Sequence, residues 1–163
     1  TKYVLLNPYI WLLSLCYVLV YVVRAAINDW GNLYMSETLG VDLVTANSAV
    51  TMFELGGFIG ALVAGWGSDK LLKGNRGPMN LIFAAGILLS VGGLWLMPFA
   101  SYVMQAASFF TTGFFVFGPQ MLIGMAAAEC SHKEAAGAAT GFVGLFAYLG
   151  ASLSGWPDRK SVV

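Results

Sequence analysis

Five long apolar stretches, separated by short polar segments, set the pattern of residues along the chain. A helix needs roughly 20 apolar residues to cross the ~30 Å hydrocarbon core of a bilayer, and each stretch is about that length or longer. The pattern therefore predicts five membrane-spanning helices, at residues 9–35, 45–66, 79–97, 102–128 and 135–155.

Composition agrees with a membrane protein and narrows the classes of function. Hydrophobic residues make up 58% of the 163 positions and charged residues 10%, which is too apolar for a soluble domain of this length. The net charge is zero, so it does not favour nucleic acid as a partner. The sequence offers no nucleophile–base pair, metal-ligand spacing or phosphate-binding glycine loop. We expect an all-α polytopic membrane protein that is not an enzyme and binds no cofactor or metal.

Charges in the connecting segments predict how the helices are oriented. Segment 67–78 contains three basic residues, whereas segment 28–44 contains three acidic residues and no basic one. The positive-inside rule then places 67–78 in the cytoplasm and 28–44 outside. His132 and Lys133 fall in a cytoplasmic turn, where we expect His132 to be a solvated loop residue. Cys16 lies in the first span and Cys130 beside that turn, a reducing setting that argues against a disulfide.

Arg24 is a charged residue within the first apolar stretch. A helix that ended at Val23 would measure only ~22 Å from residue 9, too short to cross the bilayer, so the helix must continue and Arg24 lies near mid-depth. A guanidinium at that depth costs at least ~2.5 kcal/mol, and such residues usually line a substrate pathway. Tyr17, Tyr21, Arg24 and Asn28 recur at spacings that share one helical face. We expect this face to line a ligand cavity; the alternative is a buried ion pair with tyrosines between helices.

The second span carries a matching polar stripe of Asn47, Thr51 and Glu54. Glu54 is a candidate counter-charge for Arg24, because a neutral pair is less costly to bury than either ion alone. An incoming anion could then compete with Glu54 for Arg24. A permanent structural pair is the alternative interpretation.

Proline and glycine positions indicate how the remaining helices bend and pack. Gly118 and Pro119 lie in the middle of the fourth span, where a proline favours a kink that would turn Gln120 toward a cavity. Small residues recur at helical spacing in two rows, Gly56, Gly60 and Ala64 in the second span and Gly137, Gly141 and Gly144 in the fifth. Both rows predict closely packed helices, and Tyr148 continues the second row toward the cavity.

Several motifs resemble a known family of transporters. Segments GWGSDK (65–70) and KGNRG (73–77) are similar to the cytoplasmic signature loop of the major facilitator superfamily. The residues that carry this similarity are Gly65, Asp69, Lys70, Gly74 and Arg76. Segments 21–24, 28–30, 117–124, 135–137 and 146–149 resemble the organophosphate:phosphate antiporters within that superfamily. The resemblance extends from residue 3 to about residue 157.

The resemblance implies a fold and a binding site. Residues 1–157 would form a partial C-terminal half of a twelve-helix protein, holding helices seven to eleven. Arg24 stands where the family has an arginine that grips the substrate phosphate together with a second arginine on helix one. Tyr21, Glu54 and Tyr148 likewise match family site positions. The chain departs from the family at three positions: it has Phe117 where the glycerol-phosphate carrier has a tyrosine, and Thr140 and Val143 where the hexose-phosphate carrier has Asp and Lys.

Within the family, segments 25–32 and 126–133 are most similar to the transporter-like sensors of hexose phosphate. These proteins of the bacterial inner membrane detect external glucose 6-phosphate and act through a membrane sensor histidine kinase. The resemblance thus implies a multi-pass receptor whose partners are a sugar phosphate, the lipid bilayer, the kinase and the N-terminal half of the same protein. The alternative is a carrier that exchanges hexose phosphate or glycerol 3-phosphate for inorganic phosphate.

The two ends of the chain look unlike the rest. Thr1 is not a start methionine, so we expect a fragment that opens within a longer protein. Residues 158–163 (DRKSVV) are similar to a translated sequencing-adapter sequence, and we expect a non-native tail there. By itself, such a fragment is expected neither to signal nor to transport.

Overall fold

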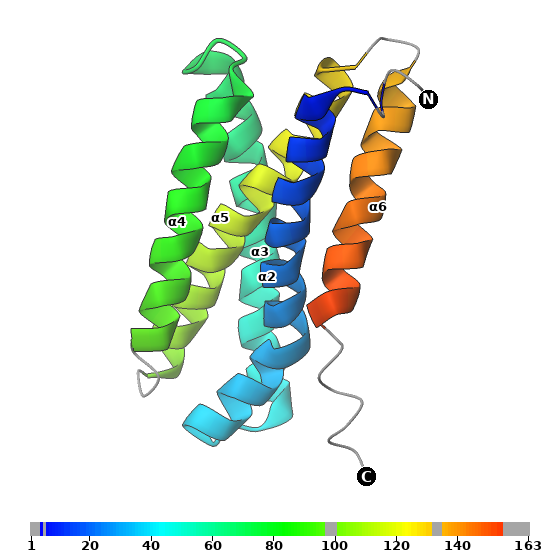
Figure 1. Ribbon diagram of the computed structural model, residues 1–163. Helices are drawn as coiled ribbons and strands as arrows, with labels where there is room; N and C mark the ends of the chain where they lie inside the picture. The colour runs from blue at the N-terminus through cyan, green and yellow to red at the C-terminus, as the bar shows by residue number, and fades with distance from the viewer. Residues whose placement is uncertain (1–3, 5, 97–100, 132–134, 155–163) are drawn as a thin grey trace. The chain divides into compact units, whose positions relative to one another are not determined.

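The computed structural model describes residues 4, 6–96, 101–131 and 135–154. Within these ranges it is helical and contains no strand (Figure 1). The five helices are α2 (Pro8–Leu39), α3 (Leu43–Lys70), α4 (Arg76–Leu96), α5 (Tyr102–Glu129) and α6 (Ala136–Ser154). All five are long and apolar enough to cross a membrane. The predicted all-α polytopic fold is confirmed. The tail 158–163, His132 and Lys133 lie outside the described residues.

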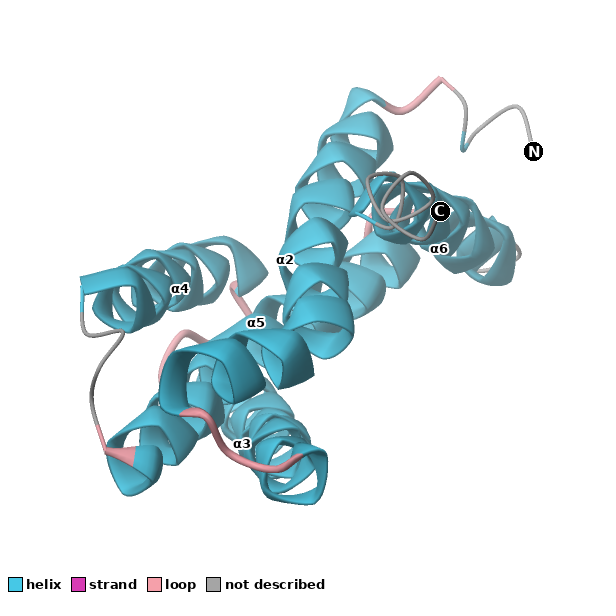
Figure 2. Ribbon diagram, turned by 90° about the horizontal axis from the view of Figure 1, so that it is seen from below, coloured by secondary structure: helices cyan, strands magenta, loops and turns pink. Residues whose placement is uncertain are grey.

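The helices match the predicted spans but several run past them, with short loops and turns between (Figure 2). α2 continues to Leu39 and ends where Gly40 adopts φ 62°, and the Gly40 N–H donates to the Ser36 carbonyl at 3.0 Å. α3 begins directly after Asp42, which is its N-cap residue. The Asp42 side chain accepts a hydrogen bond from the Val44 N–H at 3.4 Å. Apolar length predicts only the part of a helix that lies in lipid, whereas the capping residues determine its actual ends.

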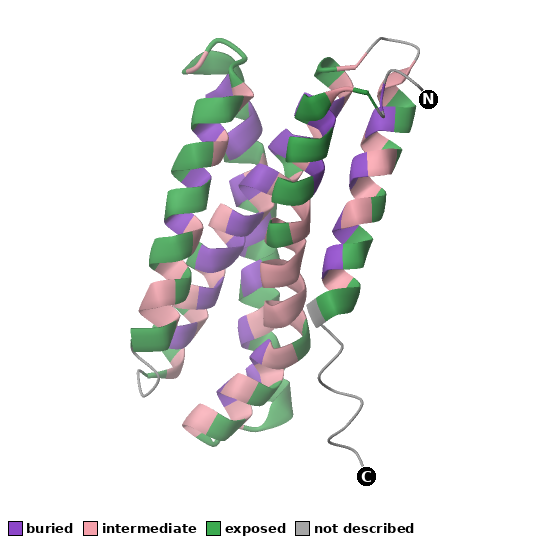
Figure 3. Cartoon of the chain, in the orientation of Figure 1, coloured by how far each residue is buried: buried purple, intermediate pink, exposed green. Residues whose placement is uncertain are grey.

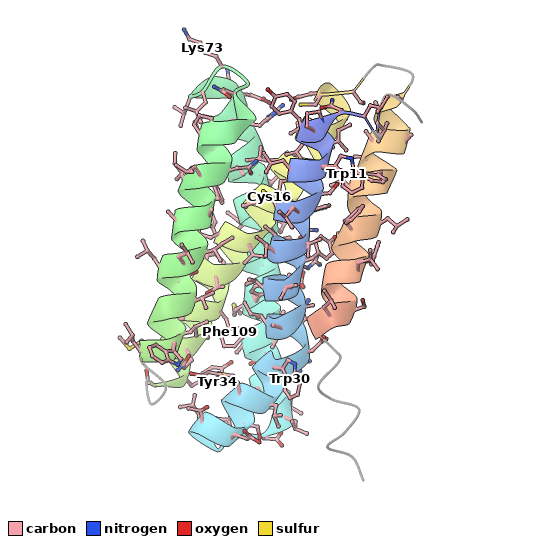
Figure 4. The ribbon with its side chains drawn as sticks, viewed as in Figure 1. Trp11, Cys16, Trp30, Tyr34, Lys73 and Phe109 are labelled. Atoms are coloured by element: carbon pink, nitrogen blue, oxygen red, sulfur yellow. The ribbon has the colours of Figure 1, made fainter. Side chains whose placement is uncertain are left out.

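The predicted loop at 67–78 is shorter than the sequence indicated. α3 remains helical through Lys70 and α4 begins at Arg76. After Lys70 the chain turns, with Lys73 and Gly74 at positive φ, 52° and 81°, and the Gly74 N–H donates to the Ser68 carbonyl at 2.9 Å. Lys73 projects away from the helices at this turn (Figure 4). Asp69 and Lys70, predicted as loop residues, therefore belong to α3, and so does Gly65, which also falls within the predicted span 45–66.

The residues group into two compact units, and both boundaries fall inside helices. One unit, which we call the terminal unit, comprises Thr1–Ala26 and Gln120–Val163. The other, the central unit, comprises Ile27–Pro119. The terminal unit thus contains the first part of α2, the last part of α5 and α6, and the central unit contains the rest.

In the central unit, α3 and α5 approach backbone to backbone. A Cβ added to Gly56 would overlap the Phe110 carbonyl, and one added to Gly60 would overlap the Phe114 carbonyl. Gly113 on α5 lies equally close to the Phe53 carbonyl of α3. The close packing predicted for Gly56 and Gly60 is confirmed, since only glycine fits at such distances.

Phenylalanine rings fill the space between α3, α4 and α5. Phe83 stacks on Phe114 with ring centroids 5.6 Å apart, and its edge-to-face neighbour Phe115 lies at 5.7 Å. Phe53 and Phe117 form another edge-to-face pair at 5.7 Å. Such pairs add to the stability that area burial alone provides, so these three helices are held along their contact by rings as well as by glycines.

In the terminal unit, α2, α5 and α6 share a small apolar core of Val4, Ile10, Ile123, Ala127, Ala139 and Val143. Trp11 of α2 points toward α6 (Figure 4), where it makes edge-to-face contacts with Phe142 at 5.3 Å and Phe146 at 5.7 Å. Gly150 of α6 lies against the backbone of Val18 on α2.

The second row of small residues does not pack as predicted. A Cβ added to Gly137, Gly141 or Gly144 would meet no atom within 4 Å among the described residues. α6 instead packs through a different face, where Ala139, Val143, Ala147 and Gly150 recur at helical spacing and are buried. Small residues permit close approach but do not by themselves determine which face a neighbour takes.

Much of the helix surface is apolar and exposed. Exposed apolar residues recur along α4 (Figure 3), among them Leu81, Leu88, Leu89 and Trp95. A soluble protein rarely presents so much apolar surface, whereas lipid-facing helices require it.

Candidate functional site

Helix α2 carries Arg24 at its middle. The helix begins at Pro8, a residue whose fixed φ suits the first turn, and the Asn7 side chain caps it by accepting from the Tyr9 N–H at 3.0 Å. It continues without a break past Arg24, which lies 16 residues after Pro8 and 15 residues before Leu39. The prediction that this helix extends beyond Arg24 is confirmed.

Arg24 is held by a side chain from α5. Its Nη1 donates to Oε1 of Gln120 at 2.9 Å, and Nε2 of Gln120 donates to the Tyr21 hydroxyl oxygen at 3.2 Å. The Arg24 guanidinium carbon also lies 5.7 Å from the centroid of the Tyr21 ring, within the range of a cation–π contact. Arg24, Gln120 and Tyr21 thus contact one another in a closed cluster inside the terminal unit.

Two more tyrosines border this cluster. Tyr17 packs edge-to-face on Tyr21 with centroids 4.9 Å apart, and Tyr148 of α6 lies 6.2 Å from Tyr21. Tyr148 is 73% exposed, so its ring forms the outer side of the group. The terminal unit therefore brings together five residues that the sequence selected: Tyr17, Tyr21, Arg24, Gln120 and Tyr148.

The other two selected residues lie in the central unit. Asn28 Nδ2 donates to Glu54 Oε1 at 3.4 Å, which joins α2 to α3. Asn47, Thr51 and Glu54 are all exposed along α3, as expected for a polar stripe. Because Arg24 and Glu54 belong to different units, their pairing stays a prediction.

The residues around Pro119 behave partly as expected. α5 stays helical through Pro119, and a kink there stays a prediction. Gly118 lies against the Phe83 ring, and Gln120 accepts a hydrogen bond from Arg24, whereas its orientation toward a cavity stays a prediction. The sequence did not predict the hydrogen bond between Arg24 and Gln120, because the two residues are 96 positions apart and no local pattern links them.

The positions that depart from the carriers have structural roles in this chain. Phe117 packs on Phe53 and Gly57, so its ring belongs to the aromatic packing of the central unit. Thr140 donates to the Ala136 carbonyl of its own helix at 2.6 Å. Val143 is fully buried in the core of the terminal unit.

An ion pair joins α3 to α4 at the positions of the signature motif. Arg76 Nη1 lies 2.9 Å from Asp69 Oδ1, and Arg76 is nearly buried whereas Asp69 is 59% exposed. The pair spans the five-residue turn between the helices. Asp69 and Arg76 therefore hold the end of α3 against the start of α4.

The cysteines form no disulfide, as predicted. Cys16 and Cys130 are both free and exposed. In the part of the chain that is described, no three His, Cys, Asp or Glu residues gather as metal ligands would.

Comparison with known proteins decides the family. The model of the Major Facilitator Superfamily matches residues 1–155, nearly the whole chain. The chain belongs to the Major Facilitator Superfamily. The five helices that could span a membrane agree with this family.

Individual members of the superfamily are similar over almost the full chain. The chain is 96% identical to the membrane sensor protein UhpC of Salmonella typhimurium, over 98% of its own length and 36% of that protein. It is 94% identical to UhpC of Escherichia coli, with the same coverage. It is 51% identical to a "Probable hexose phosphate transport protein" of Chlamydia trachomatis, over 97% of the chain and 35% of that protein.

These relatives confirm the predicted resemblance to a membrane sensor and to a hexose phosphate carrier, and with the five described spans they identify a multi-pass inner-membrane protein. Their names describe sensors and a transporter, and none describes an enzyme. The chain spans about a third of the length of the relatives it matches.

Proposed function

We propose that the full-length protein containing this chain is a receptor with a transporter fold that senses external glucose 6-phosphate. The observation that carries the proposal is the identity of 96% and 94% with two membrane sensor proteins over 98% of the chain. It would signal through a membrane sensor histidine kinase to induce hexose-phosphate uptake, with no catalytic step of its own. The chain would supply helices seven to eleven of twelve.

The Arg24 cluster is the proposed phosphate contact. A guanidinium offers planar, paired donors that match phosphate oxygens better than an ammonium does. Arg24 would act with a second arginine from the N-terminal half, so that two cations share the phosphate charge. The other proposed substrate contacts are Tyr17, Tyr21, Gln120 and Tyr148 of the terminal unit, and Asn28 and Glu54 of the central unit.

Signalling would follow if glucose 6-phosphate bound one conformation of the receptor more tightly than another. A ligand shifts a conformational equilibrium only when it binds one state more tightly than the other. Phosphate held between arginines of the two halves would favour the arrangement in which both reach it. The kinase would then respond to that arrangement.

A second candidate function is a carrier that exchanges an organophosphate for inorganic phosphate by rocking one half against the other. The 51% identity with a hexose phosphate transport protein favours it. Reconstituted full-length protein that exchanges labelled phosphate at the rate of a carrier would support this function. Co-purification with a sensor kinase, without substantial exchange, would support the receptor.

A reporter experiment tests the receptor directly. Full-length protein with Arg24→Ala is expressed in cells that carry a reporter for hexose-phosphate uptake genes, and Arg24→Lys serves as the charge-retaining control. We expect Arg24→Ala to abolish induction by glucose 6-phosphate and Arg24→Lys to need more ligand. Full sensitivity in Arg24→Ala, at normal protein levels, would show that Arg24 does not grip the phosphate.

A further inference from the structure

We propose that Gln120 is a positioning residue, which holds the Arg24 guanidinium in place and directs the Tyr21 hydroxyl proton toward the ligand phosphate. The inference rests on the proposed function and assigns Gln120 a task that differs from contact with the sugar. It starts from the two hydrogen bonds of its amide, one to Arg24 and one to Tyr21.

The chemistry of the partners fixes the orientation of the amide. A guanidinium has only donors, so the Gln120 atom at 2.9 Å from Arg24 Nη1 must be the oxygen. The nitrogen then lies 3.2 Å from the Tyr21 hydroxyl, to which it donates. Tyr21 and Arg24 are three residues apart on α2 and share a face, which lets one side chain from α5 reach both.

The bond from Gln120 determines what Tyr21 can offer a ligand. A phenol hydroxyl both donates and accepts, and here its oxygen accepts from the Gln120 amide. The hydroxyl proton must therefore point away from Gln120. A phosphate dianion presents only acceptors, so Tyr21 and Arg24 both meet it as donors.

The neutrality of Gln120 matters as much as its geometry. An amide holds the guanidinium by a hydrogen bond without cancelling its charge, whereas a carboxylate at the same place would neutralise it. A carboxylate would also accept the Tyr21 proton and remove that donor from the ligand. Because the cluster is half-buried, such electrostatic effects are stronger than in bulk water.

The test uses purified full-length protein and measures binding of glucose 6-phosphate and of inorganic phosphate by calorimetry. Gln120→Met removes both hydrogen bonds at nearly constant volume, and Gln120→Glu keeps the shape but adds a charge. The matched control is Gln105→Met, the same change on the same helix but in the central unit. Thermal unfolding without ligand reports whether each variant is folded.

We expect Gln120→Met to weaken binding of both ligands by roughly tenfold to a hundredfold, the range for a hydrogen bond to a charged group. Gln120→Glu should weaken both further, and Gln105→Met should change neither. In an Arg24→Ala background, Gln120→Met should cause a clearly smaller loss than in wild-type protein, because only the bond to Tyr21 is then left to remove. A merely structural role would not give this dependence on Arg24.

Three results would overturn the inference. Wild-type affinity in Gln120→Met would show that the residue positions nothing. Loss of glucose 6-phosphate binding with normal phosphate binding would show that Gln120 contacts the sugar instead. Equal losses in the Met and Glu variants would contradict the requirement for neutrality. If wild-type protein bound phosphate but no glucose 6-phosphate, the proposed function would fail, while the phosphate measurements would still decide the role of Gln120.

Discussion

Arg24 of α2 and Gln120 of α5 meet in a hydrogen bond of 2.9 Å, although 96 positions separate them in the sequence. The bond gives a charged residue in mid-helix a neutral partner, which satisfies one of its donors and leaves its charge in place. The Gln120 amide also bonds to Tyr21, so two side chains of α2 depend on one side chain of α5.

The glycines between α3 and α5 should not tolerate a side chain. Gly60→Ala places a Cβ on the Phe114 carbonyl, a backbone atom that cannot move aside without shifting a helix. We expect full-length protein with this change to lose about 1–3 kcal/mol of stability, the usual cost of overpacking, and to unfold at a lower temperature. Gly92→Ala is the control, because a Cβ there meets no atom of the described residues within 4 Å. Equal melting temperatures for both variants would contradict this packing.

Trp11 should stabilise the terminal unit through its two aromatic neighbours. Trp11→Ala removes edge-to-face contacts with Phe142 and Phe146, each worth ~0.5–1.5 kcal/mol. Thermal unfolding of the full-length protein should therefore show a clear decrease in melting temperature. Trp95→Ala, the same change at a residue that is 80% exposed, should have a smaller effect. The reverse order of the two effects would show that Trp11 does not anchor α6.

The ion pair between Asp69 and Arg76 should contribute little to stability. Arg76 is nearly buried, but Asp69 is 59% exposed, so water and salt screen the carboxylate, and pairs screened in this way contribute ~0–1 kcal/mol. Asp69→Asn should lower the free energy of unfolding by less than ~1 kcal/mol, and high salt should abolish the difference. Lys73→Gln at the tip of the same turn should change nothing measurable. A large loss that persists in high salt would assign Asp69 a role beyond this pair.

The sequence predicted the five helices because apolar length is a strong and local signal. It did not predict where α3 ends, since the helix continues through Lys70 before the chain turns at Lys73 and Gly74, which adopt positive φ. It selected Tyr17, Tyr21 and Arg24 as one face because helical spacing is also local. The bond to Gln120 depends on how α5 approaches α2, which spacing within one helix cannot reveal.

The glycine rows illustrate the same limit. Gly56 and Gly60 are at a helix contact, whereas Gly137, Gly141 and Gly144 meet no described neighbour. Both rows have the same kind of spacing. Only the arrangement of the neighbouring helices distinguishes a row that is packed from one that is open.

Binding of glucose 6-phosphate to purified full-length protein tests the central claim most directly. Calorimetric titration compares wild-type protein with Arg24→Lys and Arg24→Ala. If Arg24 grips the phosphate, Arg24→Ala should weaken binding by at least about a hundredfold, because it leaves the ligand charge without one of its cations. The affinity of Arg24→Lys should lie between those of wild-type protein and Arg24→Ala. Wild-type affinity in folded Arg24→Ala protein would contradict the account.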